Sequence, residues 1–126
     1  MEWSIEYPLD AKEIADTPRS PGVYEILQAT AYPRYFGETR VLKIGMSKES
    51  LRNELLNHLN RHTAANRIFR VKRRQAVTFH YCEVPAPDVL EAEKALLRQY
   101  EDEYWDLPVF NSTRGYERGK DLHYRK

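Results

Sequence analysis

The alternation of apolar and polar residues predicts two β-strands early in the chain. It runs over Pro21–Leu27 and again over Val41–Ser47, and a period of two is typical of strands. Each stretch carries a glycine, Gly22 and Gly45, where we expect backbone to approach another group closely. The residues between them, Gln28–Arg40, contain turn-forming proline and glycine and are predicted to form a long hairpin connection.

The same alternation assigns side chains to faces, because successive strand side chains point to opposite sides. Tyr24 and Ile26 are expected together on one face of the first strand. Leu42 and Ile44 are expected together on one face of the second, with Lys43 on the opposite face. A lysine held in mid-strand requires a partner for its charge.

Leucines recur every three or four residues after the second strand, which predicts a helix over residues 51–62. Ser47 or Ser50 can cap its start. Its buried stripe is expected to comprise Leu51, Leu55, Leu56 and Leu59. Glu54 and His58 lie together along one edge of this stripe, because residues four apart are neighbours on a helix.

The longest helix is predicted over residues 89–104. Its core-facing stripe is expected to comprise Leu90, Leu97, Tyr100 and Tyr104. Glu93 has the same spacing and should face inward, whereas Glu101 falls on the solvent side. A core-facing carboxylate is costly unless it is paired or binds a metal. Glu93 is therefore the most informative acid, and a salt bridge to Lys43 or Arg52 is its structural alternative.

Shorter elements complete the expected fold. Trp3–Tyr7 and Gln75–Val84 alternate as strands, and Ala11–Ala15 and Ala64–Val71 are expected to be helical. Together the elements predict an α+β fold, with a small central, mostly antiparallel sheet of three strands or slightly more, flanked by helices.

Length and composition indicate one domain, since 126 residues can bury an adequate core. The single cysteine, Cys82, excludes an internal disulfide. No apolar run has the length of a membrane span, and the N-terminus lacks the pattern of a signal peptide, so a cytoplasmic location is expected.

Charge is distributed unevenly, although the formal net charge is only +1. Residues 55–82 contain no acid and six bases, which are Arg61, Arg67, Arg70, Lys72, Arg73 and Arg74. Such a basic block is typical of a surface that follows nucleic-acid phosphates. The alternative is a solvated face that is balanced by the acidic residues of 83–106.

Five landmarks in order resemble the GIY-YIG nuclease superfamily. Gly22-Val23-Tyr24 is similar to its first tripeptide and Lys43-Ile44-Gly45 to its second, with lysine in place of tyrosine. The later landmarks are Leu51 with Glu54 and His58, then Glu93 before two aliphatic residues, and finally Pro108 and Asn111. The resemblance covers residues 21–111. It leaves residues 1–20 as an N-terminal extension that packs on the core and residues 112–126 as a basic tail.

The resemblance implies a metal-dependent endonuclease that hydrolyses phosphodiester bonds, in DNA more than in RNA. Glu93 would bind Mg²⁺ or Mn²⁺, and Tyr24 would be the general base or its relay. The catalytic set that it implies is Tyr24, Lys43, Arg52, His58, Glu93 and Asn111. The sequence leaves the oligomeric state open, and a homodimer would suit this activity, since a nuclease with one site usually needs two copies to break both strands.

Glu54 occupies the position where the family has an arginine that stabilises the transition state. Three explanations are open: Arg52 or Arg61 supplies the charge, Glu54 joins Glu93 as a metal ligand, or catalysis is lost. Two alternatives to the nuclease follow. One is a weakened or inactive member that binds nucleic acid through residues 61–74, and the other is a protein-interaction domain that uses the region around Tyr100–Trp105.

Overall fold

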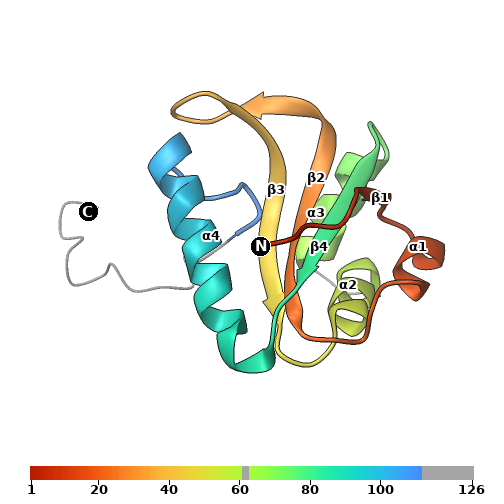
Figure 1. The fold of residues 1–126 in the computed structure, drawn as a ribbon. Helices are drawn as coiled ribbons and strands as arrows, with labels where there is room; N and C mark the ends of the chain where they lie inside the picture. The colour runs from red at the N-terminus through yellow and green to blue at the C-terminus, as the bar shows by residue number, and fades with distance from the viewer. Residues whose placement is uncertain (61–62, 112–126) are drawn as a thin grey trace.

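An antiparallel sheet lies at the centre of the fold, and its strand order is β1-β4-β2-β3 (Figure 1). The computed structural model describes residues 1–60 and 63–111. The strands in them are β1 (Tyr7–Pro8), β2 (Gly22–Pro33), β3 (Glu38–Ser47) and β4 (Val77–Glu83). The predicted α+β class is confirmed, with a sheet one strand larger than the minimum expected.

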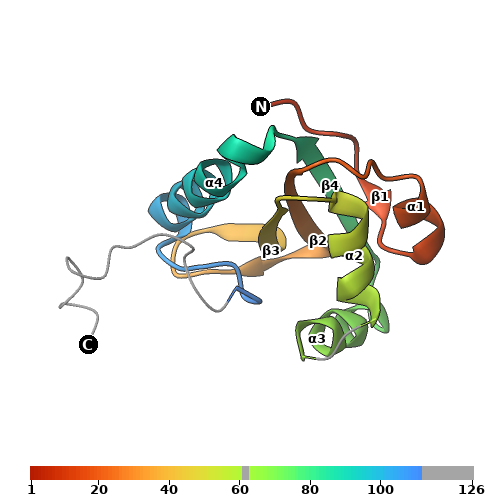
Figure 2. The ribbon, with the colours of Figure 1, turned by 90° about the horizontal axis from the view of Figure 1, so that it is seen from below.

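Helices cover both faces of this sheet. They are α1 (Ala11–Ala15), α2 (Leu51–Asn60), α3 (Thr63–Lys72), the short 3-10 helix η1 (Ala86–Asp88) and α4 (Val89–Tyr104). Figure 2 shows α4 on one side of the sheet and α2 with α3 on the other. None of the described helices has both the length and the apolarity needed to cross a bilayer.

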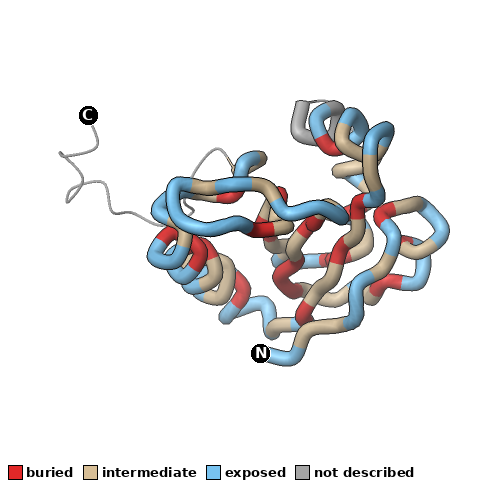
Figure 3. Tube along the Cα trace, turned by 90° about the horizontal axis from the view of Figure 1, so that it is seen from above, coloured by how far each residue is buried: buried red, intermediate tan, exposed pale blue. Residues whose placement is uncertain are grey.

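Each face has its own hydrophobic cluster, and the buried positions follow the strands and the inward sides of the helices (Figure 3). On the α2 side, Tyr24 and Ile26 pack with Leu51 and Leu55. On the α4 side, Ile44 packs with leucine and tyrosine side chains of that helix. The sheet thus separates two hydrophobic clusters.

The β2–β3 hairpin is longer than predicted, so the expectation of a long loop over Gln28–Arg40 is wrong. Strand pairing continues through Tyr32 and Thr39 to Pro33 and Glu38. Only residues 34–37 form the turn, which is closed by the Arg34 N–H donating to the Gly37 carbonyl at 2.9 Å. Gly37 has φ +67°, a left-handed conformation that favours glycine. The turn chemistry was foreseen, but the β-forming residues beside it extend the strands.

The predicted shared face of Leu42 and Ile44 is also wrong. Ile26 pairs with Lys43 and Leu27 with Val41, so the register skips Leu42. A β-bulge adds one residue and reverses the alternation beyond it. Leu42 therefore packs on the α2 side and Ile44 on the α4 side. Because Lys43 is paired with Ile26, it faces the α2 side.

Three smaller expectations also need correction. The strand expected over Trp3–Tyr7 is confined to Tyr7–Pro8. Leu90 is 37% exposed, whereas Glu101 is only 5% exposed. Glu101 lies four residues after Leu97, so it falls on the buried stripe of α4. The end of the predicted 51–62 helix and the basic tail, 112–126, lie outside the described residues.

Candidate active site around Tyr24

A tyrosine, a glutamate and a histidine are joined by hydrogen bonds at the interface of β2 and α2. The Tyr24 hydroxyl lies 3.0 Å from Glu54 Oε2 and 2.6 Å from His58 Nε2. Glu54 and His58 are one helical turn apart, and their Oε2 and Nε2 atoms are separated by 3.6 Å. If the phenol proton points at Glu54, Nε2 of His58 must carry a hydrogen and donate to the phenol oxygen.

Burial and neighbouring charge set the ionisation of this group. Tyr24 is fully buried, and burial, with the negative charge of Glu54, raises the pKa of its phenol well above the usual value. The nearby His58 ring and the Tyr24 hydroxyl lower the pKa of Glu54 against the opposing effect of burial. Tyr24 is therefore a neutral hydrogen-bond donor at ordinary pH, and Glu54 is ionised.

Lys43 and Glu93 bring a second pair of charges to the same place from β3 and α4. Burial lowers the pKa of Lys43, while Glu54 and Glu93 both raise it. Burial raises the pKa of Glu93, Lys43 lowers it and Glu54 raises it. Within the described residues, neither side chain makes a hydrogen bond. The Lys43 ammonium group thus interacts electrostatically with two carboxylates, but within the described residues it forms a hydrogen bond with neither.

Two glycines allow this arrangement, as the sequence predicted. A Cβ atom at Gly45 would lie 2.3 Å from Cζ and the hydroxyl oxygen of Tyr24. A Cβ at Gly22 would lie 2.4 Å from the Cys82 carbonyl oxygen and 2.7 Å from a methyl of Leu51. Both separations are far below van der Waals contact. Gly45 therefore makes room for the phenol, and Gly22 lets β2 approach β4 and α2.

Asn111 fixes the strand that carries Lys43. Its side-chain amide donates to the Ile44 carbonyl at 2.8 Å, and its Oδ1 accepts from the Ile44 N–H at 2.9 Å. The neighbouring Phe110 N–H donates to the Leu42 carbonyl at 2.9 Å. These bonds hold the backbone on both sides of Lys43 at the bulge. Asn111 therefore positions the backbone of the site.

Arg52 lies elsewhere, although sequence reasoning placed it among the catalytic residues. Its Nε donates to the Thr17 carbonyl at 2.8 Å, and its backbone N–H donates to the Pro18 carbonyl at 3.2 Å. Arg52 therefore ties α2 to the segment that follows α1. Arg61, the other arginine considered, is outside the described residues.

Four of the predicted nucleic-acid-binding residues are exposed at α3 and its C-terminal end. Along α3 and just beyond it, Arg67, Arg70, Arg73 and Arg74 are exposed. Lys72 differs, because its Nζ donates to the Leu9 carbonyl at 2.5 Å and lies over the Phe69 ring. We call the four arginines the basic surface; Lys72 serves packing instead.

Sequence reasoning missed the role of Glu54. The three explanations for a glutamate at an expected arginine position do not include its bond to Tyr24, whose hydroxyl donates to the Glu54 carboxylate at 3.0 Å. The spacing of four between Glu54 and His58 was the available signal.

Comparisons of the chain with protein-family models, curated proteins and solved structures found no match. The resemblance to GIY-YIG nucleases therefore rests on the residues themselves.

Proposed function

We propose that this protein is a metal-dependent phosphodiesterase of the GIY-YIG type that cleaves nucleic acid, with DNA as the preferred substrate. The observation that carries the proposal is the hydrogen-bonded group of Tyr24, Glu54 and His58, whose carboxylate also interacts electrostatically with Lys43. Hydrolysis of a phosphodiester requires a positioned water, positive charge at the phosphate and a proton for the departing oxygen. A lysine that interacts electrostatically with two carboxylates offers groups for each of these tasks.

Lys43 is assigned two tasks. Its ammonium is a compact charge with three donors, which suits a phosphate oxygen. Because burial lowers its pKa, it also gives up a proton more readily than an exposed lysine, and the departing oxygen receives that proton. This assignment replaces the arginine that the family has at the position of Glu54.

Glu54 is assigned to the attacking water. Its carboxylate is ionised because His58 lowers its pKa, and its side chain is 34% exposed. As water attacks phosphorus, one water proton passes to Glu54, the new phosphorus–oxygen bond forms and the bond to the leaving oxygen breaks. Tyr24 is fully buried, so it positions Glu54 together with His58 rather than meeting the substrate.

Glu93 fits a magnesium ion of the kind that keeps most of its waters. Mg²⁺ is commonly held by one or two carboxylates together with substrate phosphates. Among the described residues, no group of three His, Cys, Asp or Glu side chains could enclose a metal, and the Glu93 carboxylate has no hydrogen bond there. Glu93 would therefore hold the ion with help from water and phosphate. When bound, Mg²⁺ would supply positive charge to the phosphate oxygens.

The test is a cleavage assay on supercoiled plasmid DNA and on a structured RNA, with Mg²⁺, Mn²⁺ or excess chelator. Wild type should cleave only with metal, and Glu93→Gln should lower the rate by about 100-fold or more, the usual cost of losing a charge that stabilises the transition state. Glu91→Gln is the matched control, because it neutralises an exposed acid on the same helix. Equal rates for wild type and Glu93→Gln, or undiminished cleavage in chelator, would overturn the proposal.

A second candidate is binding of nucleic acid without hydrolysis, which the basic surface favours. Four exposed arginines on one helix and its end provide phosphate contacts that do not depend on Glu93. Such binding must weaken steeply as salt rises, because phosphate contacts release counterions. Inert wild-type protein that binds DNA in this salt-dependent way, and loses binding in an Arg70→Gln, Arg73→Gln double variant, would favour this candidate over the nuclease.

A further inference from the structure

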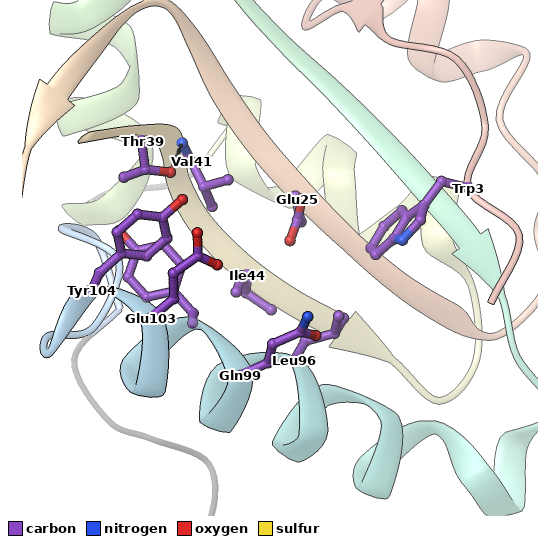
Figure 4. Close-up of a pocket in the computed structure, with 10 residues that line it drawn as sticks. Trp3, Glu25, Thr39, Val41, Ile44, Leu96, Gln99, Glu103 and Tyr104 are labelled. Atoms are coloured by element: carbon purple, nitrogen blue, oxygen red, sulfur yellow. Dashed lines mark hydrogen bonds between the residues drawn. The ribbon is translucent and has the colours of Figure 1, made fainter. Parts of the chain in front are cut away.

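A cleft of about 250 Å³ lies on the sheet face opposite the Tyr24 site, between α4 and strands β2 and β3 (Figure 4). Its floor includes Ile44, and Leu96 contributes an apolar wall from α4. Trp3 lies at one end, and Glu103 and Tyr104 approach from the helix at the other (Figure 4). Segments far apart in the sequence therefore meet around one hollow.

Carboxylates supply the charge of this cleft. Glu25 points into it from β2 and Glu103 from α4 (Figure 4). None of the described residues that line it is lysine or arginine. Burial raises the pKa of the Tyr104 phenol, and the negative charges of Glu103 and Glu25 raise it further. The cleft is therefore partly desolvated and carries a negative potential.

The polar end of the cleft is already fixed in place. Glu25 Oε1 lies 2.7 Å from His80 Nε2, and both side chains are less than a fifth exposed. The Trp3 indole stacks on the His80 ring with centroids 4.3 Å apart and planes 18° from parallel. A ligand would thus meet a preorganised carboxylate and indole, which reduces the ordering that binding requires.

We propose that this cleft binds a small organic cation, namely an ammonium group on a short apolar body. Glu25 accepts hydrogen bonds from the ammonium and the indole face attracts it as well, while the Glu103 carboxylate at the other end adds long-range attraction. Ile44 and Leu96 accommodate the apolar body. A volume of about 250 Å³ is smaller than a typical drug-sized pocket, so the ligand is a small amine. An anion would meet two carboxylates and is excluded. The inference is independent of the proposed hydrolysis, because it uses neither Glu93 nor Lys43.

The experiment is an NMR titration of the intact protein with benzylamine and phenethylamine, and with the neutral isostere benzyl alcohol. The chain has two tryptophans, and their indole N–H signals separate the cleft from the rest of the surface. Both amines should shift the Trp3 signal saturably and leave Trp105 unchanged. Benzyl alcohol should bind about fivefold more weakly or worse, since hydrogen bonds to charged groups contribute more.

Three substitutions on the exposed side of α4 sharpen the result. Glu103→Gln should weaken amine binding by about fivefold, and Gln99→Glu, which adds a carboxylate at the cleft, should tighten it. Glu91→Gln removes an equal charge from the same helix outside the cleft and should change affinity less than about twofold. Equal affinity for the amine and the alcohol, an unchanged Trp3 signal, or equal effects of Glu103→Gln and Glu91→Gln would overturn the proposal. None of these outcomes would change the interpretation of a positive cleavage assay.

Discussion

The two faces of the sheet treat their ionisable groups in opposite ways. On the α2 side, Lys43 is drawn to two carboxylates, and none of the three makes a direct salt bridge with another within the described residues. On the α4 side, acids have close partners: Glu25 lies 2.7 Å from His80, and Glu6 binds Arg40 through two bonds of 2.8 and 3.0 Å. Among the described residues, Lys43 and Glu93 thus make no hydrogen bond, whereas Glu25 and Glu6 each bond a basic side chain.

This difference distinguishes the residues that we propose for catalysis from the residues that serve structure or ligand binding. Unsaturated charges of mixed sign are costly for stability, and here they are concentrated at the site for which we propose phosphodiester hydrolysis. Paired charges fix the position of a strand or a ring, as His80 does for Trp3. Among the described residues that line the cleft beside them, Glu25 and Glu103 are acids and none is lysine or arginine, and in the proposed binding these acids would select the charge of the ligand.

The largest predicted effect is on Lys43. Lys43→Ala should reduce cleavage by about 100-fold or more, because phosphate loses its positive contact. In wild type the cleavage rate should rise with pH as Glu93 ionises. This rise should occur at a higher pH than for an ordinary glutamate, because the pKa of Glu93 is raised. The rate should fall again as Lys43 loses its proton, below the usual range of a lysine.

Rates measured across pH for Lys43→Arg test this assignment. A guanidinium stays protonated, so the fall at high pH should move upward or disappear. An unchanged profile would show that Lys43 does not set the upper limit, and the contrast between the two faces would lose its main support.

A smaller effect is predicted for Gly45→Ala, which tests the packing beneath the site. The added methyl would sit 2.3 Å from the Tyr24 ring, and overpacking of this kind costs about 1–3 kcal/mol. The free energy of unfolding, measured with urea, should fall accordingly. In a Tyr24→Leu background the same substitution should cost less, because the ring is gone. An equal loss in both backgrounds would place the strain elsewhere.

The smallest effect is predicted for the paired charges of the α4 side. Hydrogen bonds from Arg40 and Thr78 lower the pKa of Glu6 from 4.5 to about 2. A carboxyl whose pKa is lowered by folding stabilises the protein above its unfolded pKa, and this stabilisation is lost as pH falls through the folded value.

Glu6→Gln should therefore lower the melting temperature slightly at pH 7, because partly exposed ion pairs contribute little. The difference from wild type should shrink as pH falls from 4.5 towards 2. A difference that stays constant over this range would mean that the Glu6 charge is not what stabilises the face.

Local patterns predicted much of this molecule. Leucine spacing placed α2, and the two glycines were correctly expected where backbone approaches other groups. The bulge at Leu42 was not predictable, because alternation carries no sign of an added residue until a partner strand sets the register. The hydrogen bond from Tyr24 to Glu54 was missed because it joins residues thirty positions apart, and only the packing of α2 on β2 brings them together.

The central claim is that Glu93 holds a divalent cation beside Lys43. The most direct measurement is NMR line broadening by substoichiometric Mn²⁺ in wild type and in Glu93→Gln. We expect selective broadening of the backbone amides of Lys43, Gly45 and Glu93 in wild type, and its loss in the variant. Broadening that is the same in both proteins, or that spares these amides, would contradict it.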